Sequence, residues 1–512
     1  MKRHSRTTYS IMNMFANFIG YGLNLVISFL CRMVFTHCLA QEYLGVSGLF
    51  SNILSMLSLT ELGIGTAIVY ALYKPIAQND YEKIASLMKF YGTAYKIIGC
   101  CVAAFGLCLL PFLDWIIGDQ PAIQENLKVI YILYLFNSAS SYFFSYRSTI
   151  LTASQRNYIV TSINYIMVII QNIIQMIILV VTKNFMLYLV IQIVCMFITN
   201  IWISEKAKHD YPYIVKKDVK PLAKGEKKGI AKNVKALTVY KLSGILVNNT
   251  DNIVITYFNG LITTGAASNY TLFTGMISSM LNMVFGSMTA SIGSLNATED
   301  DDKKYEIFKA LNLASFWLYG WATVGIIVVS GDMIRLFFGN EYVLSQNIPI
   351  ILAINFYMVG MQTIVLNYKS TMGLFKYGQY LLLITAAINI IGDIILAPHF
   401  GLFGVFLATV ISRLFTNVWY DPFAVFKHGL HRNILEYALE YIQYLCVLAV
   451  ATVLSYILCS YYKGNLIIKV MISMVVCSVI SNGLFFLVFR KRGEFQYLKE
   501  KIKNIIKRRV SN

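Results

Sequence analysis

The chain has 512 residues, of which 57% are hydrophobic and only 13% are charged, and it carries a formal net charge of +18. Soluble proteins contain about 25% charged residues, so this composition excludes a soluble globular protein. The basic excess does not indicate a nucleic-acid partner, because the lysines and arginines are spread between apolar runs. The nine cysteines show neither metal-site nor disulfide spacing and are interpreted as small packing residues.

Apolar runs long enough to cross a bilayer, which takes about 20 helical residues, recur along the whole chain. The first run follows Lys2, Arg3 and Arg6 in the manner of a signal peptide, but it is too long for one and lacks a cleavage site. We therefore predict an all-α polytopic membrane protein with fourteen transmembrane helices, at 11–35, 43–72, 85–112, 125–146, 158–181, 185–204, 236–258, 266–295, 306–330, 348–368, 377–397, 402–426, 436–459 and 465–489.

The basic residues fall on alternate sides of the predicted spans. If the N-terminus is cytoplasmic, 34 of the 43 lysines and arginines lie in the predicted inner segments, which are 1–10, 73–90, 146–157, 206–235, 296–309, 369–376, 427–435 and the tail after residue 489. This asymmetry follows the positive-inside rule and places both termini in the cytoplasm. The acidic stretch 299–302 departs from the pattern, but acids contribute little to that rule.

A lysine-rich segment at 206–235, with ten lysines and three acids, divides the chain. We predict that it is a cytoplasmic linker between two six-helix lobes. The predicted domains are an N-terminal lobe at 1–205, the linker at 206–235, a C-terminal lobe at 236–430, two extra helices at 431–490 and a basic tail at 491–512.

The two lobes show traces of an internal repeat. The segment 146–149 (YRST) recurs 222 residues later as 368–371 (YKST), and Tyr158 aligns with Tyr380 at the same offset. Gly45 aligns with Gly265 at an offset of 220. Spans 1–6 are therefore predicted to correspond to spans 7–12, related by an axis along the membrane normal. Such parallel repeats are typical of transporters that bind substrate at the repeat interface.

The sequence favours transport over catalysis. It contains no glycine-rich nucleotide loop, no metal-ligand spacing and no outer loop long enough to form a catalytic domain. We therefore predict that the protein is not an enzyme and needs no organic cofactor. A scaffold for a biosynthetic complex is an alternative that no feature supports.

The arrangement of six, six and two spans, with a basic linker after the sixth, resembles the multidrug/oligosaccharidyl-lipid/polysaccharide exporter superfamily, and its lobes look MATE-like. The segments 61–67 (ELGIGTA) and 72–75 (LYKP), with Tyr70 between them, are similar to the end of the second span in its polysaccharide flippases. The resemblance implies a monomer in the bacterial cell membrane that moves an undecaprenyl-diphosphate-linked oligosaccharide outward by alternating access. It also implies glycosyltransferases and a polymerase as partners.

A diphosphate with sugars cannot cross about 30 Å of hydrocarbon unaided, so ionisable residues in the spans are candidate substrate contacts. Four bases lie at the predicted inner ends of spans, namely Lys74, Arg147, Lys241 and Lys369. The alternative for these four is that their side chains extend to the lipid headgroups and do not contact substrate. A cation at mid-depth, as predicted for Arg413, needs a cavity or a partner. The predicted substrate-binding residues are Arg32, Glu61, Lys74, Arg147, Lys241, Lys369 and Arg413. Lipid II flippases and cation-coupled multidrug antiporters, which share the fold, remain alternatives.

Oxygen-bearing residues also recur at similar depth in three predicted spans. Asn389 and Asp393 lie four residues apart on span 11, as do Val405 and Thr409 on span 12, and this spacing places each pair on one helix face. Asp251 lies in a polar cluster of span 7. Carboxylates, an amide, a hydroxyl and the Val405 carbonyl suit a hard cation, so we predict a sodium site and sodium as the coupling ion.

The same pattern is similar to the sodium site of the lipid II flippases, including the twelve-residue step from Asp393 to Val405. Two alternatives remain open. In the first, Asn389 and Asp393 have only a structural role and form hydrogen bonds with neighbouring helices. A proton carried by Asp251 or Asp393 would also couple transport to an ion gradient.

Overall fold

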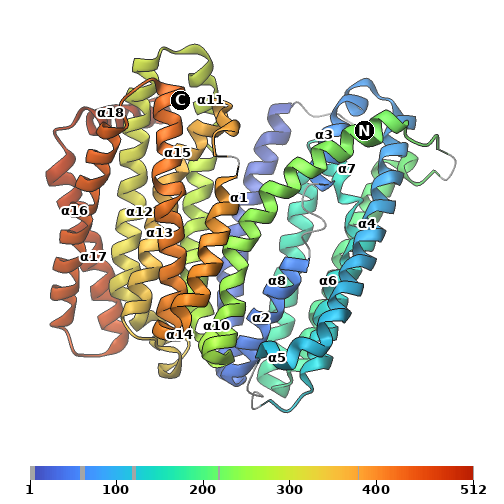
Figure 1. Cartoon of the computed structure of the whole chain (residues 1–512), viewed down its shortest axis with the longest axis horizontal. Helices are drawn as coiled ribbons and strands as arrows, with labels where there is room; N and C mark the ends of the chain where they lie inside the picture. The colour runs from blue at the N-terminus through green and yellow to red at the C-terminus, as the bar shows by residue number, and fades with distance from the viewer. Residues whose placement is uncertain (1–5, 58–63, 118–122, 217–218, 379, 511–512) are drawn as a thin grey trace. The chain divides into compact units, whose positions relative to one another are not determined.

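The computed structural model describes residues 6–57, 64–117, 123–216, 219–378 and 380–510 (Figure 1). Within these ranges the chain contains helices and no strand, and helical residues occur in each of the fourteen predicted spans. In this described part, nine helices are long and apolar enough to cross a membrane. The predicted all-α polytopic fold is confirmed.

Packing divides the chain into two compact units, Met1–Gly265 and Ala266–Asn512. In the first unit α1 packs along α8, and α6 packs against both α4 and α9. Its helices are α1 (Arg6–Cys38), α2 (Gln41–Leu57), α3 (Ile64–Gln78), α4 (Tyr81–Leu109), η2 (Leu110–Phe112), α5 (Leu113–Ile117), α6 (Leu127–Ser145), α7 (Ser148–Ala153), α8 (Asn157–Thr182), α9 (Phe185–Asp210), η3 (Pro212–Val215) and the first part of α10 (Lys224–Gly286).

In the second unit α12 packs against α13 and against the pair formed by α16 and α17, which stand side by side in Figure 1. Buried aromatic side chains such as Phe308, Phe316 and Tyr368 fill its core. After the end of α10, its helices are α11 (Thr289–Thr298), α12 (Asp301–Phe337), η4 (Asn340–Tyr342), α13 (Asn347–Thr371), η5 (Leu374–Lys376), α14 (Leu381–Phe415), α15 (Asn417–Val425), η6 (Phe426–Leu430), α16 (Ile434–Ser460), α17 (Leu466–Phe489) and α18 (Gly493–Val510).

The helices α10 and α14 each contain two predicted spans, joined at a glycine. Gly260 (φ 80°) and Gly401 (φ 56°) leave the helical conformation and adopt a positive φ that favours glycine. In α14, a Cβ atom on Gly392 would lie 2.9 Å from the Cβ of Ala408. The two halves of α14 therefore lie against each other as a hairpin, as expected for spans 11 and 12.

The boundary between the packed units, at Gly265, differs from the predicted linker between the lobes. One reason is a close helix crossing, where a Cβ atom on Gly45 of α2 would lie only 2.1 Å from the carbonyl oxygen of Leu261 in α10. A Cβ atom on Gly265 would lie 3.1 Å from the backbone nitrogen of Gly45. The two glycines aligned by the sequence repeat thus meet at this crossing, while the repeat-based lobes stay a prediction.

Several long helices begin at a residue that caps their free backbone N–H groups. For example, the side chain of Asn433 accepts from the N–H of Leu435 at the start of α16. Such caps matter because helix ends leave N–H groups without helical partners, and hydrocarbon cannot satisfy them. The capping residues are Asp80, Asn126, Asn184, Asp300, Asn433 and Asn465.

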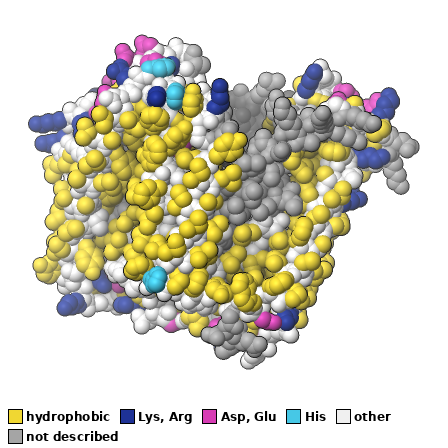
Figure 2. All heavy atoms as spheres, in the orientation of Figure 1, with side chains coloured by type: hydrophobic (Ala, Val, Ile, Leu, Met, Phe, Trp, Pro, Cys, Tyr) yellow, Lys and Arg dark blue, Asp and Glu magenta, His cyan; other side chains and the backbone are white. Residues whose placement is uncertain are grey.

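The outer faces of the second unit suit a lipid environment. Large apolar side chains on α16 and α17 are exposed, among them Leu439, Val453 and Val475. Figure 2 shows hydrophobic side chains covering the middle of this unit, with charged side chains gathered toward its two ends. This distribution is typical of a protein that is embedded in a bilayer.

The predicted linker 206–235 is helical at both ends and is attached to the start of α4. Ser86 donates from Oγ to the carbonyl oxygen of Lys220 at 2.7 Å, and Lys83 forms an ion pair with Glu226. The hydrogen bond from Lys83 lowers the pKa of the Glu226 carboxyl. The linker is therefore held against the first unit over part of its length.

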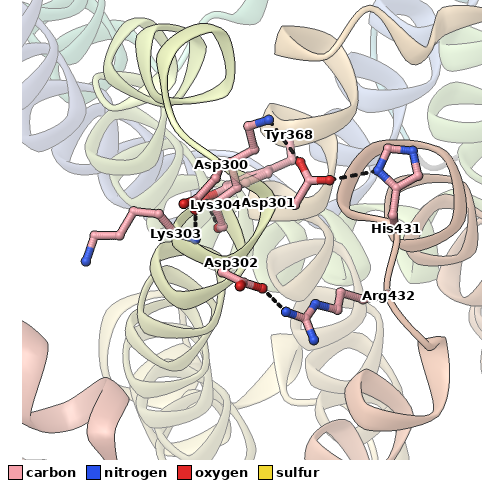
Figure 3. A network of polar contacts seen from close by, with 8 residues as sticks. All are labelled: Asp300, Asp301, Asp302, Lys303, Lys304, Tyr368, His431 and Arg432. Atoms are coloured by element: carbon pink, nitrogen blue, oxygen red, sulfur yellow. Dashed lines mark hydrogen bonds and ion pairs between the residues drawn. The ribbon is translucent and has the colours of Figure 1, made fainter.

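The acidic stretch that departs from the charge pattern is paired with bases (Figure 3). Asp301 lies 2.9 Å from Nδ1 of His431 and 3.1 Å from Nζ of Lys304, and Asp302 forms an ion pair with Arg432. His431 and Arg432 belong to another segment that is predicted to be cytoplasmic. The acids therefore join two inner connections, which is a structural reason for their presence on that side.

The predicted orientation has a direct test in two exposed positions, Lys220 and Ser345. Single cysteines at these positions, in a background without the native cysteines, should react differently with an impermeant maleimide on intact cells. We expect labelling at position 345, which is predicted to face outside. Position 220, which is predicted to face the cytoplasm, should be labelled only after the cells are permeabilised. Labelling in the reverse order would invert the topology.

Candidate functional site

The α14 hairpin brings four of the five predicted sodium ligands together. Nδ2 of Asn389 lies 3.2 Å from Oγ1 of Thr409 and 3.5 Å from Oδ1 of Asp393. The Thr409 hydroxyl in turn donates to the carbonyl oxygen of Val405 at 3.3 Å. None of the four residues is more than 3% exposed, so they form a compact polar cluster inside the second unit.

The chemistry of this cluster fits a hard cation. It offers a carboxylate, an amide oxygen, a hydroxyl and a backbone carbonyl, which are the ligand types that such ions prefer. Among the described residues, no hydrogen-bond donor lies against Oδ1 of Asn389 although this oxygen is buried. The Val405 carbonyl, which the sequence suggested as a ligand, already accepts a hydrogen bond from the Thr409 hydroxyl. As a residue within α14, Val405 also has its carbonyl in the helical hydrogen-bond ladder, so its role as an ion ligand stays a prediction.

Asp251, the fifth predicted ligand, lies in α10 and belongs to the first unit. Its side chain is half-buried, and the neighbouring Thr250 is buried. Its place in a sodium site therefore stays a prediction.

The polar interior of the hairpin extends beyond the predicted ligands. Oγ1 of Thr385 lies 2.8 Å from Oγ1 of Thr416 and 3.3 Å from Oδ1 of Asn417, and Oγ1 of Thr416 donates to the Ser412 carbonyl at 2.6 Å. All are buried. The sequence carried a signal for this extension, since Thr385 precedes Asn389 by four residues and so continues the same helix face.

Lys369, a predicted substrate contact, is held in a buried ion pair. Its Nζ atom lies 2.5 Å from Oδ1 of Asp421 on α15, and the two side chains are only 14% and 6% exposed. Sequence reasoning missed Asp421, which lies near the end of predicted span 12. An acid on the inner side of an apolar helix was the available signal.

Arg147, the repeat counterpart of Lys369, has neutral partners. Its Nη1 donates to Oγ of Ser204 on α9 at 2.5 Å, and its Nε donates to the hydroxyl of Tyr146 at 3.1 Å. Its guanidinium carbon lies 5.3 Å from the centre of the Tyr146 ring. Arg147 is half-buried, so its charge is positioned at the end of α6 without being neutralised by these contacts.

The other predicted substrate contacts are dispersed. Arg32 lies half-buried in α1, and Lys74 is exposed in α3 next to Pro75. Arg413 lies in the last turn of α14, just before the bend at Thr416 that separates it from α15. Two predicted contacts fall outside what the structure describes, namely Glu61 and the side chain of Lys241 in α10.

No family model matches the chain. An uncharacterized membrane protein of Methanocaldococcus jannaschii is 22% identical to it over 520 residues, which cover 96% of this chain and 97% of that protein. At this level of identity the similarity extends over the full length but does not establish a family.

Several solved structures have a similar fold. The lipid II flippase MurJ, in an inward closed conformation, matches with a TM-score of 0.67 and 13% identity, covering 94% of this chain and 99% of MurJ. An inward-facing multidrug resistance MATE transporter of the MOP superfamily matches with a TM-score of 0.56 and 14% identity, covering 79% of this chain and 94% of the transporter. A MATE transporter of Vibrio cholerae matches with a TM-score of 0.53 and 14% identity, covering 83% of this chain and 99% of the transporter. The chain is thus a multi-pass membrane protein with the fold that MurJ and these MATE transporters share.

Proposed function

We propose that this protein is a flippase that moves an undecaprenyl-diphosphate-linked oligosaccharide repeat unit from the cytoplasmic to the outer leaflet by alternating access. The observation that carries this proposal is Arg147, a half-buried cation held by neutral oxygens, in a chain whose fold matches a lipid II flippase over 94% of its length. An anionic diphosphate needs such a cation, because it cannot cross hydrocarbon without compensation of its charge.

Sodium is proposed as the coupling ion. The buried oxygen cluster of Asn389, Asp393, Val405 and Thr409 supports this role, because a bound cation would compensate the charge of a carboxylate that is fully buried. Asp251 is proposed as the fifth ligand. A proton carried by one of the two acids is the competing mechanism, and it predicts transport that depends on pH and not on sodium.

Two related functions compete with this proposal. The MurJ match favours lipid II as cargo, since lipid II also carries a prenyl diphosphate. The MATE matches favour a cation-coupled multidrug antiporter, but Arg147 at a substrate site would repel a cationic drug. We place the protein in the bacterial cell membrane as a monomer, with both termini cytoplasmic and with glycosyltransferases and a polymerase as functional partners.

The proposal has a direct test in proteoliposomes. The full chain is reconstituted with a lipid-linked oligosaccharide that carries a fluorophore on its sugar, and an impermeant quencher reports the fraction of sugar on the outer surface. We expect sodium-dependent movement of this lipid. Parallel samples with lipid II and with a cationic dye separate the alternatives. Movement of lipid II alone or of the dye alone would contradict the proposed cargo.

A further inference from the structure

The two repeat-equivalent cations, Arg147 and Lys369, occupy matching positions but have different partners. Each lies at the inner end of a predicted span, the fourth or the tenth, and each reaches a residue near the inner end of the sixth or twelfth. For Lys369 that residue is Asp421, and for Arg147 it is Ser204. Both halves of the repeat therefore have a cation at this position, and both cations contact a residue of the corresponding helix. The partner is charged in one half and neutral in the other.

This difference decides which positive charge remains for a ligand. The Lys369 ammonium is neutralised at 2.5 Å by Asp421. Among the residues that the structure describes, no Asp or Glu lies within ion-pair distance of Arg147, whose partners are the hydroxyls of Ser204 and Tyr146. The guanidinium is thus oriented by two neutral oxygens and keeps its full charge.

The two acids that follow Ser204 in α9, Glu205 and Asp210, are paired with other bases. Glu205, next to Ser204, pairs with Lys208. Asp210, whose side chain is fully buried, lies 2.8 Å from Arg156 and 3.2 Å from Lys206. Within the described part of α9, both acids that follow Ser204 are therefore already paired with other bases.

We propose that Arg147 is the residue that binds the diphosphate of the lipid-linked substrate on the cytoplasmic side, and that Lys369 is a structural cation. This inference rests on the proposed function. A guanidinium has five N–H groups in a planar fork that suits phosphate oxygens. Two of them are used for Ser204 and Tyr146, so the remaining ones are sufficient for a bidentate contact. Ser204 positions the fork, and a carboxylate in its place would block it.

The test measures binding of undecaprenyl diphosphate to the purified full chain in detergent. Arg147→Ala should weaken binding by about tenfold to a hundredfold, as expected for the loss of a hydrogen-bonded charge contact. Ser204→Asp should weaken it by about tenfold, because it installs the neutralising partner that Lys369 has. The matched control is the double variant Lys369→Met with Asp421→Leu, which removes the structural cation together with its partner and should bind within a few-fold of wild type. Arg147→Lys should bind between wild type and Arg147→Ala.

The outcomes separate this inference from the function on which it rests. If wild type binds the prenyl diphosphate and both Arg147→Ala and Ser204→Asp bind it equally well, the role of Arg147 is wrong, and the proposed cargo is then supported by the wild-type binding itself and no longer by Arg147. If wild type prefers phosphatidylglycerol over the prenyl diphosphate, Arg147 is a contact for membrane headgroups and the inference fails. If inorganic pyrophosphate binds as tightly as the prenyl form, the site recognises a free anion, which also contradicts it.

Discussion

Asp393→Asn is expected to abolish the stabilisation that sodium gives to the purified protein. A ligand that binds only the folded state stabilises it by about 2.7 kcal/mol at a hundredfold excess over its dissociation constant. Removing the only carboxylate of the α14 cluster removes most of the attraction for a cation, so nearly all of this amount should be lost. The measurement is the shift in thermal unfolding between sodium and potassium buffers of equal ionic strength.

The control for this experiment is Asp332→Asn. Asp332 lies in α12, in an ion pair with Lys469 at 2.8 Å, and it is not part of the α14 cluster. Its variant should keep the full sodium-dependent shift even if its overall stability falls. Because the readout is the difference between two salts, a general loss of stability in Asp393→Asn does not imitate the effect. A sodium shift that survives in Asp393→Asn would exclude the site.

The fold could be predicted from sequence because membrane helices obey strong local rules. A span needs a long apolar run, and its backbone must satisfy its hydrogen bonds internally, so hydropathy locates helices such as α16 and α17 closely. The hairpin spacing of Asn389, Asp393, Val405 and Thr409 also follows from helical periodicity. Periodicity thus pairs Asn389 with Asp393 and Val405 with Thr409, whereas the break of α14 at Gly401 brings the two pairs together.

The partners of the charged residues could not be predicted in the same way. Nothing local to Lys369 or Arg147 indicates that one faces Asp421 and the other Ser204, since each contact joins helices far apart in the chain. The acidic stretch 299–302 likewise acquires its explanation only from His431 and Arg432, about 130 residues away. Sequence patterns identify ionisable residues in spans, but only packing shows which of them are neutralised.

Asp421→Ala is expected to destabilise the protein by about 3–5 kcal/mol, the range found when one member of a buried ion pair is removed. The reason is that the Lys369 ammonium, whose side chain is 14% exposed, would be left without its counter-charge. The measurement is thermal or denaturant unfolding in detergent. The double variant Lys369→Met with Asp421→Leu is the control, because it removes both charges and should recover most of the loss. If Asp421→Ala lowers the free energy of unfolding by less than about 1 kcal/mol, Lys369 reaches the headgroup region without its partner. The ion pair would then contribute little to stability.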